Sequence, residues 1–145
     1  MPYQRLIFTL HYDSGQFCLS RNFRLQRVGN VNWLVKNYDL PALCAALDEL
    51  VILNVTRSEF KQKFNAQFFD DLSVILENCF CPVSIGGGVN SLSDAKLLFS
   101  AGADKVIVSS ALISNPILPS QIAAIYGSQA ITLWLDCDDV AFRLK

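Results

Sequence analysis

Two groups of small residues in this chain, one of glycines and one of serines, could together bind a phosphate. Gly86, Gly87 and Gly88 follow one apolar run, and Ser109 and Ser110 follow the next. Glycines let the backbone turn sharply and bring amide groups close to a ligand. Aligned amide dipoles and hydroxyls can hold a dianion without Lys or Arg. The pattern predicts a phosphate site; the alternative is a tight turn with ordinary loop serines.

These residues meet only if the apolar runs before them are neighbouring strands of a parallel sheet. Short, nearly continuous apolar runs bounded by Gly, Ser or Asp are typical of strands buried on both faces. The runs cover residues 5–12, 49–55, 82–85, 105–108 and 130–135.

Segments of helical period separate the runs, over residues 31–47, 65–78, 91–101 and 119–127. Pro41 interrupts the first, so we expect two pieces there. Ser91 and Asp94 resemble a capping box, and Gly102 stands where a helix should end. The alternation predicts an α/β fold in one domain, residues 1–145: a (β/α)4 half-barrel of the TIM-barrel type with a parallel sheet and a fifth strand. A closed barrel needs eight strands and about 250 residues.

Composition excludes several kinds of partner. The 145 residues carry 12 Lys+Arg and 13 Asp+Glu without a basic run, which predicts no nucleic-acid or membrane binding. The amino terminus lacks the features of a signal peptide. Five cysteines without a C-x₂-C pair, with His11 the only histidine, predict no zinc site and no disulfide framework. We therefore expect a reduced, cytoplasmic protein without a metal or cofactor.

Several segments, taken in order, resemble the cyclase subunit of imidazole glycerol phosphate synthase, a HisF-like barrel of the ribulose-phosphate-binding type. The match runs from residue 5 to about residue 140 and includes Arg5-Leu6-Ile7, Gly15, Asn22-Phe23, Asp48-Glu49-Leu50-Val51, VSIGGGV, AGADKV and GSQAITLWLD. The resemblance implies half of a lyase of histidine biosynthesis that takes ammonia from a glutaminase partner. It also places the glycine and serine loops on the family's phosphate-binding loops.

The resemblance implies a catalytic pair of aspartates at the ends of strands one and five, one to donate a proton and one to remove it. Asp136 matches the second position, but His11 stands at the first. Leu19 replaces the usual lysine of the first loop, and Asn54 replaces the strand-two aspartate. These changes predict loss of the parent reaction. The alternatives are that His11 only forms hydrogen bonds at the barrel mouth and that Asp136 only caps a turn.

Charged residues at the start of three strands map to the family's ammonia gate. Arg5, Glu49 and Lys105 should gather at the bottom of the barrel, and Asp104 maps to the glutaminase interface. Ordinary closure of the barrel bottom is the alternative.

Half a barrel should leave its inner face uncovered. We expect that face to present Ile7, Leu53, Ile85, Val106 and Leu133 or their neighbours, beside two unpaired strand edges. Exposed apolar patches and open edges favour association, most simply as a two-fold dimer.

Three functions remain open. The first is a phosphate-binding half-barrel without cyclase activity. The second is an enzyme: the histidine-pathway cyclase, or an ammonia-using synthase that makes amidino sugars for surface polysaccharides. The third is a structural or regulatory protein that binds a barrel-type partner. His11, Leu19 and Asn54 favour the first or third, whereas Asp136 and the charged bottom ring favour the second.

Overall fold

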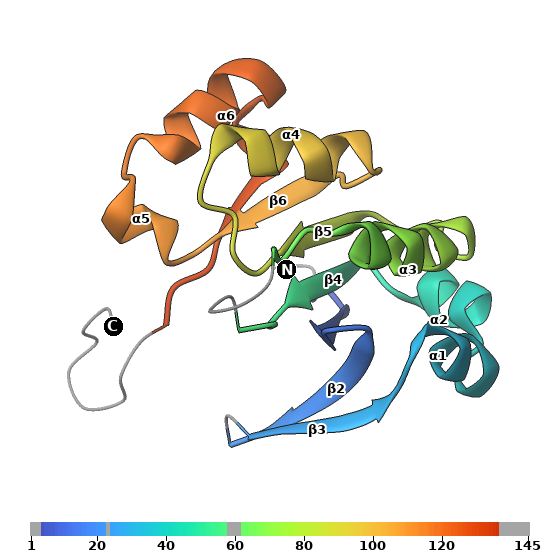
Figure 1. Ribbon diagram of the computed structural model, residues 1–145. Coiled ribbons are helices and arrows are strands. Elements are labelled where there is room, and N and C mark those ends of the chain that lie inside the picture. The colour runs from blue at the N-terminus through green and yellow to red at the C-terminus, as the bar shows by residue number, and fades with distance from the viewer. Residues whose placement is uncertain (1–3, 23, 58–61, 137–145) are drawn as a thin grey trace.

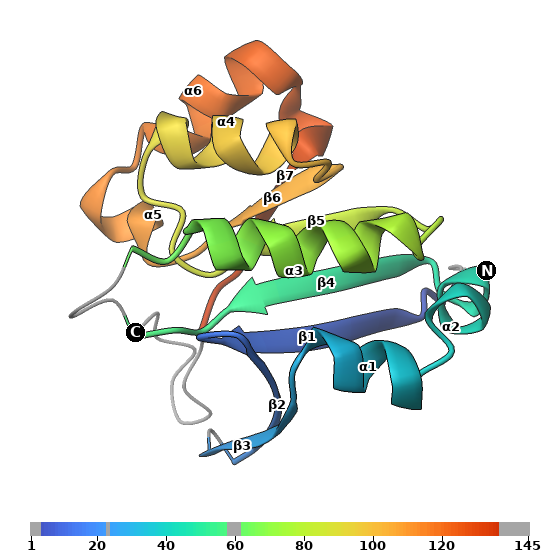
Figure 2. The same ribbon diagram turned by 45° about the vertical axis from the view of Figure 1, so that its right-hand side comes forward.

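The structure, a computed structural model, describes residues 4–22, 24–57 and 62–136. All strands of the described part belong to one sheet. Both ends of the predicted domain, with Cys137, lie outside the described residues. The seven strands run in the order β3-β2-β1-β4-β5-β6-β7 (Figure 1, with β1 and β7 labelled in Figure 2). They are β1 (Ile7–Asp13), β2 (Gln16–Arg21), β3 (Arg24–Gly29), β4 (Glu49–Asn54), β5 (Val83–Gly86), β6 (Lys105–Val108) and β7 (Ile131–Leu133).

The helices follow the predicted alternation and pack on one face of the sheet (Figure 2). They are α1 (Val31–Asn37), α2 (Leu40–Ala46), α3 (Ala66–Glu77), α4 (Leu92–Ser100), α5 (Ala111–Ser114) and α6 (Leu118–Tyr126), with a 3-10 turn, η1 (Ser128–Ala130). The first helical region is split as expected: Asp39 caps α2, accepting a hydrogen bond from the Ala42 amide at 3.2 Å, and Pro41 lies in its first turn. Strands β1, β4, β5, β6 and β7 pair in parallel, which confirms a partial TIM-barrel fold.

The segment after β1 is not the predicted loop but an antiparallel hairpin, β2 and β3. Ser14 and Gly15 link β1 to β2 with φ of 50° and 84°, and Asp13 pairs with Gln16 across them. Two positive φ values define the tight turn that joins twisted antiparallel strands. Asn22, with φ of 50°, lies at the next turn.

In the two short central strands, it is the neighbours of Ile85 and Val106 that lie on the face away from the helices, not these two residues themselves. Ile85 and Val106 are both 0% exposed in the core beneath the helices. Ser84 and Gly86 of β5 face the other way, as do Lys105 and Ile107 of β6, because neighbouring residues alternate between the faces of a strand. Continuous apolar runs do not reveal which residues face the helices.

The face away from the helices, here called the inner face, is therefore partly polar. Ile7 and Leu53 lie on it as predicted, and Ile7 is 48% exposed. Leu133 does not, because it pairs with Val108, a core residue. The edge of β1 from Ile7 to Leu10 pairs only with β4, since the register with β2 begins at His11. No helix in the described part of the chain is long and apolar enough to cross a membrane.

Candidate functional site

A hollow of about 450 Å³ opens on the inner face at the carboxyl ends of the strands. Four neighbouring strands are in register near this edge, at His11, Leu53, Gly86 and Ile107. Inner-facing residues from these strands therefore lie close together at the carboxyl end of the sheet. We call this the inner hollow; it is lined by His11, Ser20, Leu25, Leu53, Val55, Gly87, Ile107, Ser109, Trp134 and Asp136. The two positions predicted as catalytic, His11 and Asp136, thus line one space.

The imidazole of His11 is uncharged at neutral pH in this space. Burial lowers the pKa of its imidazole below the ordinary 6.5, because a low-dielectric environment disfavours the charged form. At neutral pH the strand-one position therefore carries no charge. Among the described residues that line the inner hollow, Asp136 is the one carboxylate, so they include no pair that could share proton donation and removal.

The glycine loop can exist only because its residues lack side chains. Gly87 and Gly88 have φ of 94° and 114°. A Cβ on Gly87 would overlap the backbone of Asn54, and one on Gly86 would overlap Ile107. The loop is therefore packed directly against the neighbouring strands.

A lysine that the sequence patterns did not reveal lies against this loop. Lys63, from the connection between β4 and α3, donates a hydrogen bond from Nζ to the Gly87 carbonyl at 3.2 Å. Burial lowers the pKa of its ammonium group. It lines a second space of about 310 Å³, the outer hollow, with Gln62, Phe64, Gly88, Asn90, Asp94, Leu97 and Ser110.

The predicted phosphate residues are thus divided between two spaces. Gly87 and Ser109 line the inner hollow, whereas Gly88 and Ser110 line the outer one beside Lys63. Gly86 is buried at the end of β5 and lines neither. Among the hydrogen bonds between described residues, none uses the amides of Gly87, Gly88 or Ser110 as donors.

The amino terminus of α4 is already occupied by a side chain. Asp94 accepts hydrogen bonds from the amides of Asn90 and Ser91, each at 3.0 Å, and its own amide donates to the Ser91 hydroxyl at 3.1 Å. This is the predicted capping box. A phosphate in the outer hollow would have to use the loop amides and Lys63 instead.

The two remaining departures from the family pattern lie away from the inner hollow. Asn54 is fully buried and fixes the following loop: its amide donates to the Lys63 carbonyl at 2.8 Å, and its oxygen accepts from the Thr56 amide at 3.1 Å. Leu19 is 53% exposed on the hairpin. Asn54 therefore positions the lysine that the outer hollow uses.

Two of the residues predicted for the bottom ring, Glu49 and Lys105, are in contact on the inner face. Lys105 Nζ lies 2.8 Å from a carboxylate oxygen of Glu49, and the Ser84 hydroxyl donates to the other oxygen. Burial alone would raise the pKa of Glu49, but hydrogen bonds from Lys105 and Ser84 and the charges of Lys105 and Arg5 outweigh it and lower the pKa. Glu49 is therefore an ionised carboxylate with a fixed set of partners.

Asp104 has a structural partner of its own. Its carboxylate accepts a hydrogen bond from the Val83 amide at 2.8 Å, and its amide donates to the Val83 carbonyl at 2.9 Å. Asp48 makes the same pair of contacts with Leu6, at 2.7 Å and 2.9 Å. Each aspartate ties the start of one strand to the next.

A one-sided layer of helices over a parallel sheet, with glycine and serine loops at its carboxyl edge, defines a partial α/β barrel of the TIM type. The chain belongs to the histidine biosynthesis protein family, whose profile matches residues 34–144, and within it the chain is HisF-like. A protein of Parasynechococcus marenigrum named as subunit hisF2 of imidazole glycerol phosphate synthase is 42% identical over 136 residues.

Two other relatives also match most of this chain. The HisF subunit of Mycobacteroides abscessus is 37% identical over 133 residues, and that of Dictyoglomus thermophilum is 33% identical over 109. These matches cover 94%, 91% and 75% of this chain but only 49%, 49% and 40% of the relatives. The chain thus spans about half the length of the relatives it matches.

Proposed function

We propose that this HisF-like half-barrel binds a phosphate or sugar phosphate at its glycine and serine loops and does not catalyse the imidazole glycerol phosphate synthase reaction. The observation that carries the proposal is the composition of the inner hollow. A neutral His11 faces the same space as Asp136, so the described lining holds one carboxylate where the resemblance implies two.

The phosphate proposal rests on donors with no other partner among the described residues. The amides of Gly87, Gly88 and Ser110 surround a strand-to-helix edge, and Lys63 supplies the positive charge beside them. A charged donor such as an ammonium group makes a stronger hydrogen bond to a phosphate oxygen than a neutral donor does.

An NMR titration of the full chain with inorganic phosphate and with a pentose phosphate tests this. We expect saturable shifts of the Gly87, Gly88, Ser109 and Ser110 amides. Lys63→Gln should weaken binding by about 10- to 150-fold, since a hydrogen bond to a charged group is worth about 1.5–3 kcal/mol. Lys36→Gln, on the exposed side of α1, is the matched control and should bind as the wild type does. Shifts that do not saturate, or equal effects of both variants, would contradict the proposal.

We also propose that a second copy covers the inner face, in a cytoplasmic dimer. The free edge of β1 from Ile7 to Leu10 and the outer edge of β7 leave backbone groups to pair. Exposed apolar side chains flank both edges: Leu6, Ile7, Leu19, Leu25, Leu133, Trp134 and Leu135. Cys18, Cys44, Cys79 and Cys81 are free thiols, as suits a reducing compartment.

A second candidate is an ammonia-using cyclase or synthase subunit with a glutaminase partner. The contacts of Glu49 with Lys105 and Ser84 favour it, because Glu49 and Lys105 are two of the residues that the resemblance assigns to ammonia entry. Ammonia-dependent turnover of the cyclase substrate, abolished by Asp136→Asn, would support this candidate. Absence of turnover at high protein concentration would support the phosphate-binding function without catalysis.

A further inference from the structure

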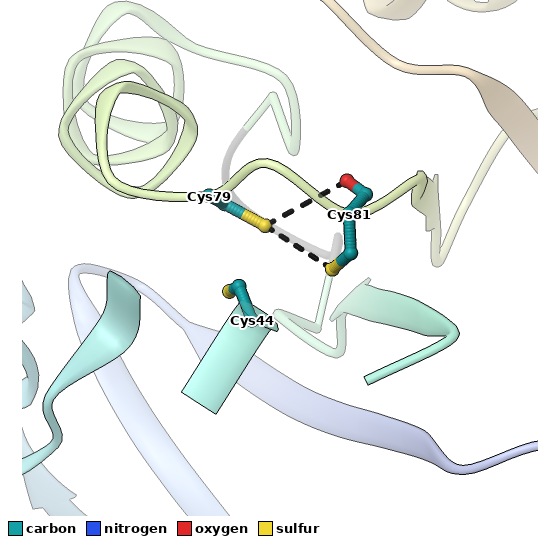
Figure 3. A group of neighbouring side chains, drawn as sticks. All are labelled: Cys44, Cys79 and Cys81. Atoms are coloured by element: carbon teal, nitrogen blue, oxygen red, sulfur yellow. Dashed lines mark hydrogen bonds between the residues drawn. The ribbon is translucent and has the colours of Figure 1, made fainter. Parts of the chain in front are cut away.

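Three cysteines meet at the amino-terminal edge of the sheet, opposite both hollows. Cys44 lies in α2, while Cys79 and Cys81 lie in the connection from α3 to β5 (Figure 3). Their sulfur atoms all lie within 4.8 Å of one another, and those of Cys79 and Cys81 are 3.5 Å apart. Cys44 is 2% exposed and Cys79 is 9% exposed, whereas Cys81 is half-buried.

We propose that Cys44, Cys79 and Cys81 bind a zinc ion as three thiolate ligands, with a water molecule as the fourth ligand. A tetrahedral site with Zn–S bonds of about 2.3 Å places its sulfurs about 3.8 Å apart. The observed spacing brackets that value, so small side-chain rotations complete the site. A hollow of about 430 Å³ lined by Cys79, Cys81 and Asp104, among others, gives water and the ion a route to the sulfurs.

The charge of the site favours zinc over copper(I), the other common ion for soft sulfur ligands. Three thiolates around Zn²⁺ leave one net negative charge, whereas around Cu⁺ they leave two. Since two of the cysteines are buried, and burying net charge is costly, the divalent ion fits better.

Protonation makes binding depend on pH. Burial raises the pKa of all three thiols, that of Cys79 to about 11, so the metal-free thiols are protonated at neutral pH. Zinc must displace these protons, and its apparent affinity should therefore fall as the pH is lowered. The same raised pKa argues against a thiolate nucleophile here, because the thiolate is the reactive form.

Sequence spacing alone predicted no zinc site. Cys79 and Cys81 form a C-x-C pair with no second pair nearby in the chain. The third thiol comes from α2, which the fold brings beside the end of α3. A bound ion would tie these two helical segments together, outside the phosphate site and independent of its function.

The test uses the full chain, purified metal-free under reducing conditions, loaded with zinc and desalted. We expect about one zinc per chain in the wild type. With Co²⁺ in place of zinc, sulfur-to-metal charge-transfer absorption should appear. Cys81→Ser and Cys44→Ala should each weaken zinc binding more than about 100-fold, because loss of second-shell groups alone costs 10–100-fold. Cys18→Ala, a buried cysteine outside the cluster, is the matched control and should bind normally.

Two outcomes would overturn the proposal. One is loss of zinc from the wild type on desalting. The other is a Co²⁺ spectrum of the wild type without sulfur charge transfer, which decides the question even if a cysteine variant fails to fold. Equal zinc retention by Cys81→Ser and Cys18→Ala would likewise overturn it.

Discussion

An imidazole in place of a carboxylate changes what the inner hollow can attract. His11 is neutral at pH 7, so the approach of a phosphate-bearing ligand meets one negative group, Asp136, and not two. Relative to the pair of aspartates that the resemblance implies, His11 leaves one carboxylate and lowers the electrostatic cost of holding an anion nearby. Both effects are what the proposed function, binding without the parent chemistry, requires.

The first prediction concerns the pH dependence of stability. The pKa of His11 is lower in the folded state than in the unfolded chain, so below about pH 6.5 the unfolded chain binds a proton at His11 more readily than the folded chain does. Protonation of His11 therefore lowers the free energy of unfolding progressively as the pH falls below 6.5. Well above pH 6.5 it has no effect on stability. In urea unfolding at pH 7.5 and pH 5, His11→Asn should lose less stability on acidification than the wild type does. An equal loss in both proteins would contradict the burial of His11.

At the scale of elements, buried parallel strands were predictable because they are nearly continuous apolar runs, and glycine and serine loops were recognisable because they directly follow such runs. Because these runs are continuous, the sequence did not show that Ile85 and Val106 face the helices and are buried. The hairpin after β1 has one local signal, the pair Ser14-Gly15, and the sequence alone does not distinguish a hairpin turn there from a turn that simply ends the strand. Lys63 could not be assigned, because its contact with Gly87 joins segments that only the folded sheet brings together.

The second prediction concerns the ion pair that links β4 to β6. Lys105→Met would leave the Glu49 carboxylate, 6% exposed, without its cation. Removing one partner of a buried pair costs about 3–5 kcal/mol; the Lys105 side chain is 26% exposed, so we expect about 2 kcal/mol.

Urea unfolding measures this cost, with Lys96→Met on the exposed side of α4 as the control. The double variant Glu49→Gln/Lys105→Met should recover more than half of the loss, because it removes the unpaired charge. A single variant as stable as its control would show that the pair does not hold the strands together.

For the whole molecule, the arrangement of layers has the widest consequence. Helices cover one face of the sheet (Figure 2). The other face is polar near the amino ends of the strands, where Ser84 and Glu49 form a hydrogen bond, and it carries the inner hollow at the carboxyl ends. The polar base makes the inner face less apolar than the sequence suggested. Apolar side chains are instead exposed along the strand edges, Trp134 and Leu135 at β7 and Leu25 at the hairpin. Association is therefore expected to proceed by edge pairing as much as by burial of the face.

The variant Trp134→Glu should weaken that association. A charge beside β7 opposes pairing at an open edge. Ile113→Glu adds the same charge on α5, at a side chain that is 70% exposed against 38% for Trp134, and should leave association unchanged. Sedimentation velocity over a concentration series compares the two, and equal behaviour would exclude the β7 edge from the contact.

The solution mass of this chain by light scattering at micromolar and higher concentrations tests the half-barrel account most directly. The account predicts particles of two chains, each of 16.1 kDa, that dissociate on dilution. A mass of 16.1 kDa at the highest concentration reached would mean that the inner face and its edges need no second copy, which contradicts the account.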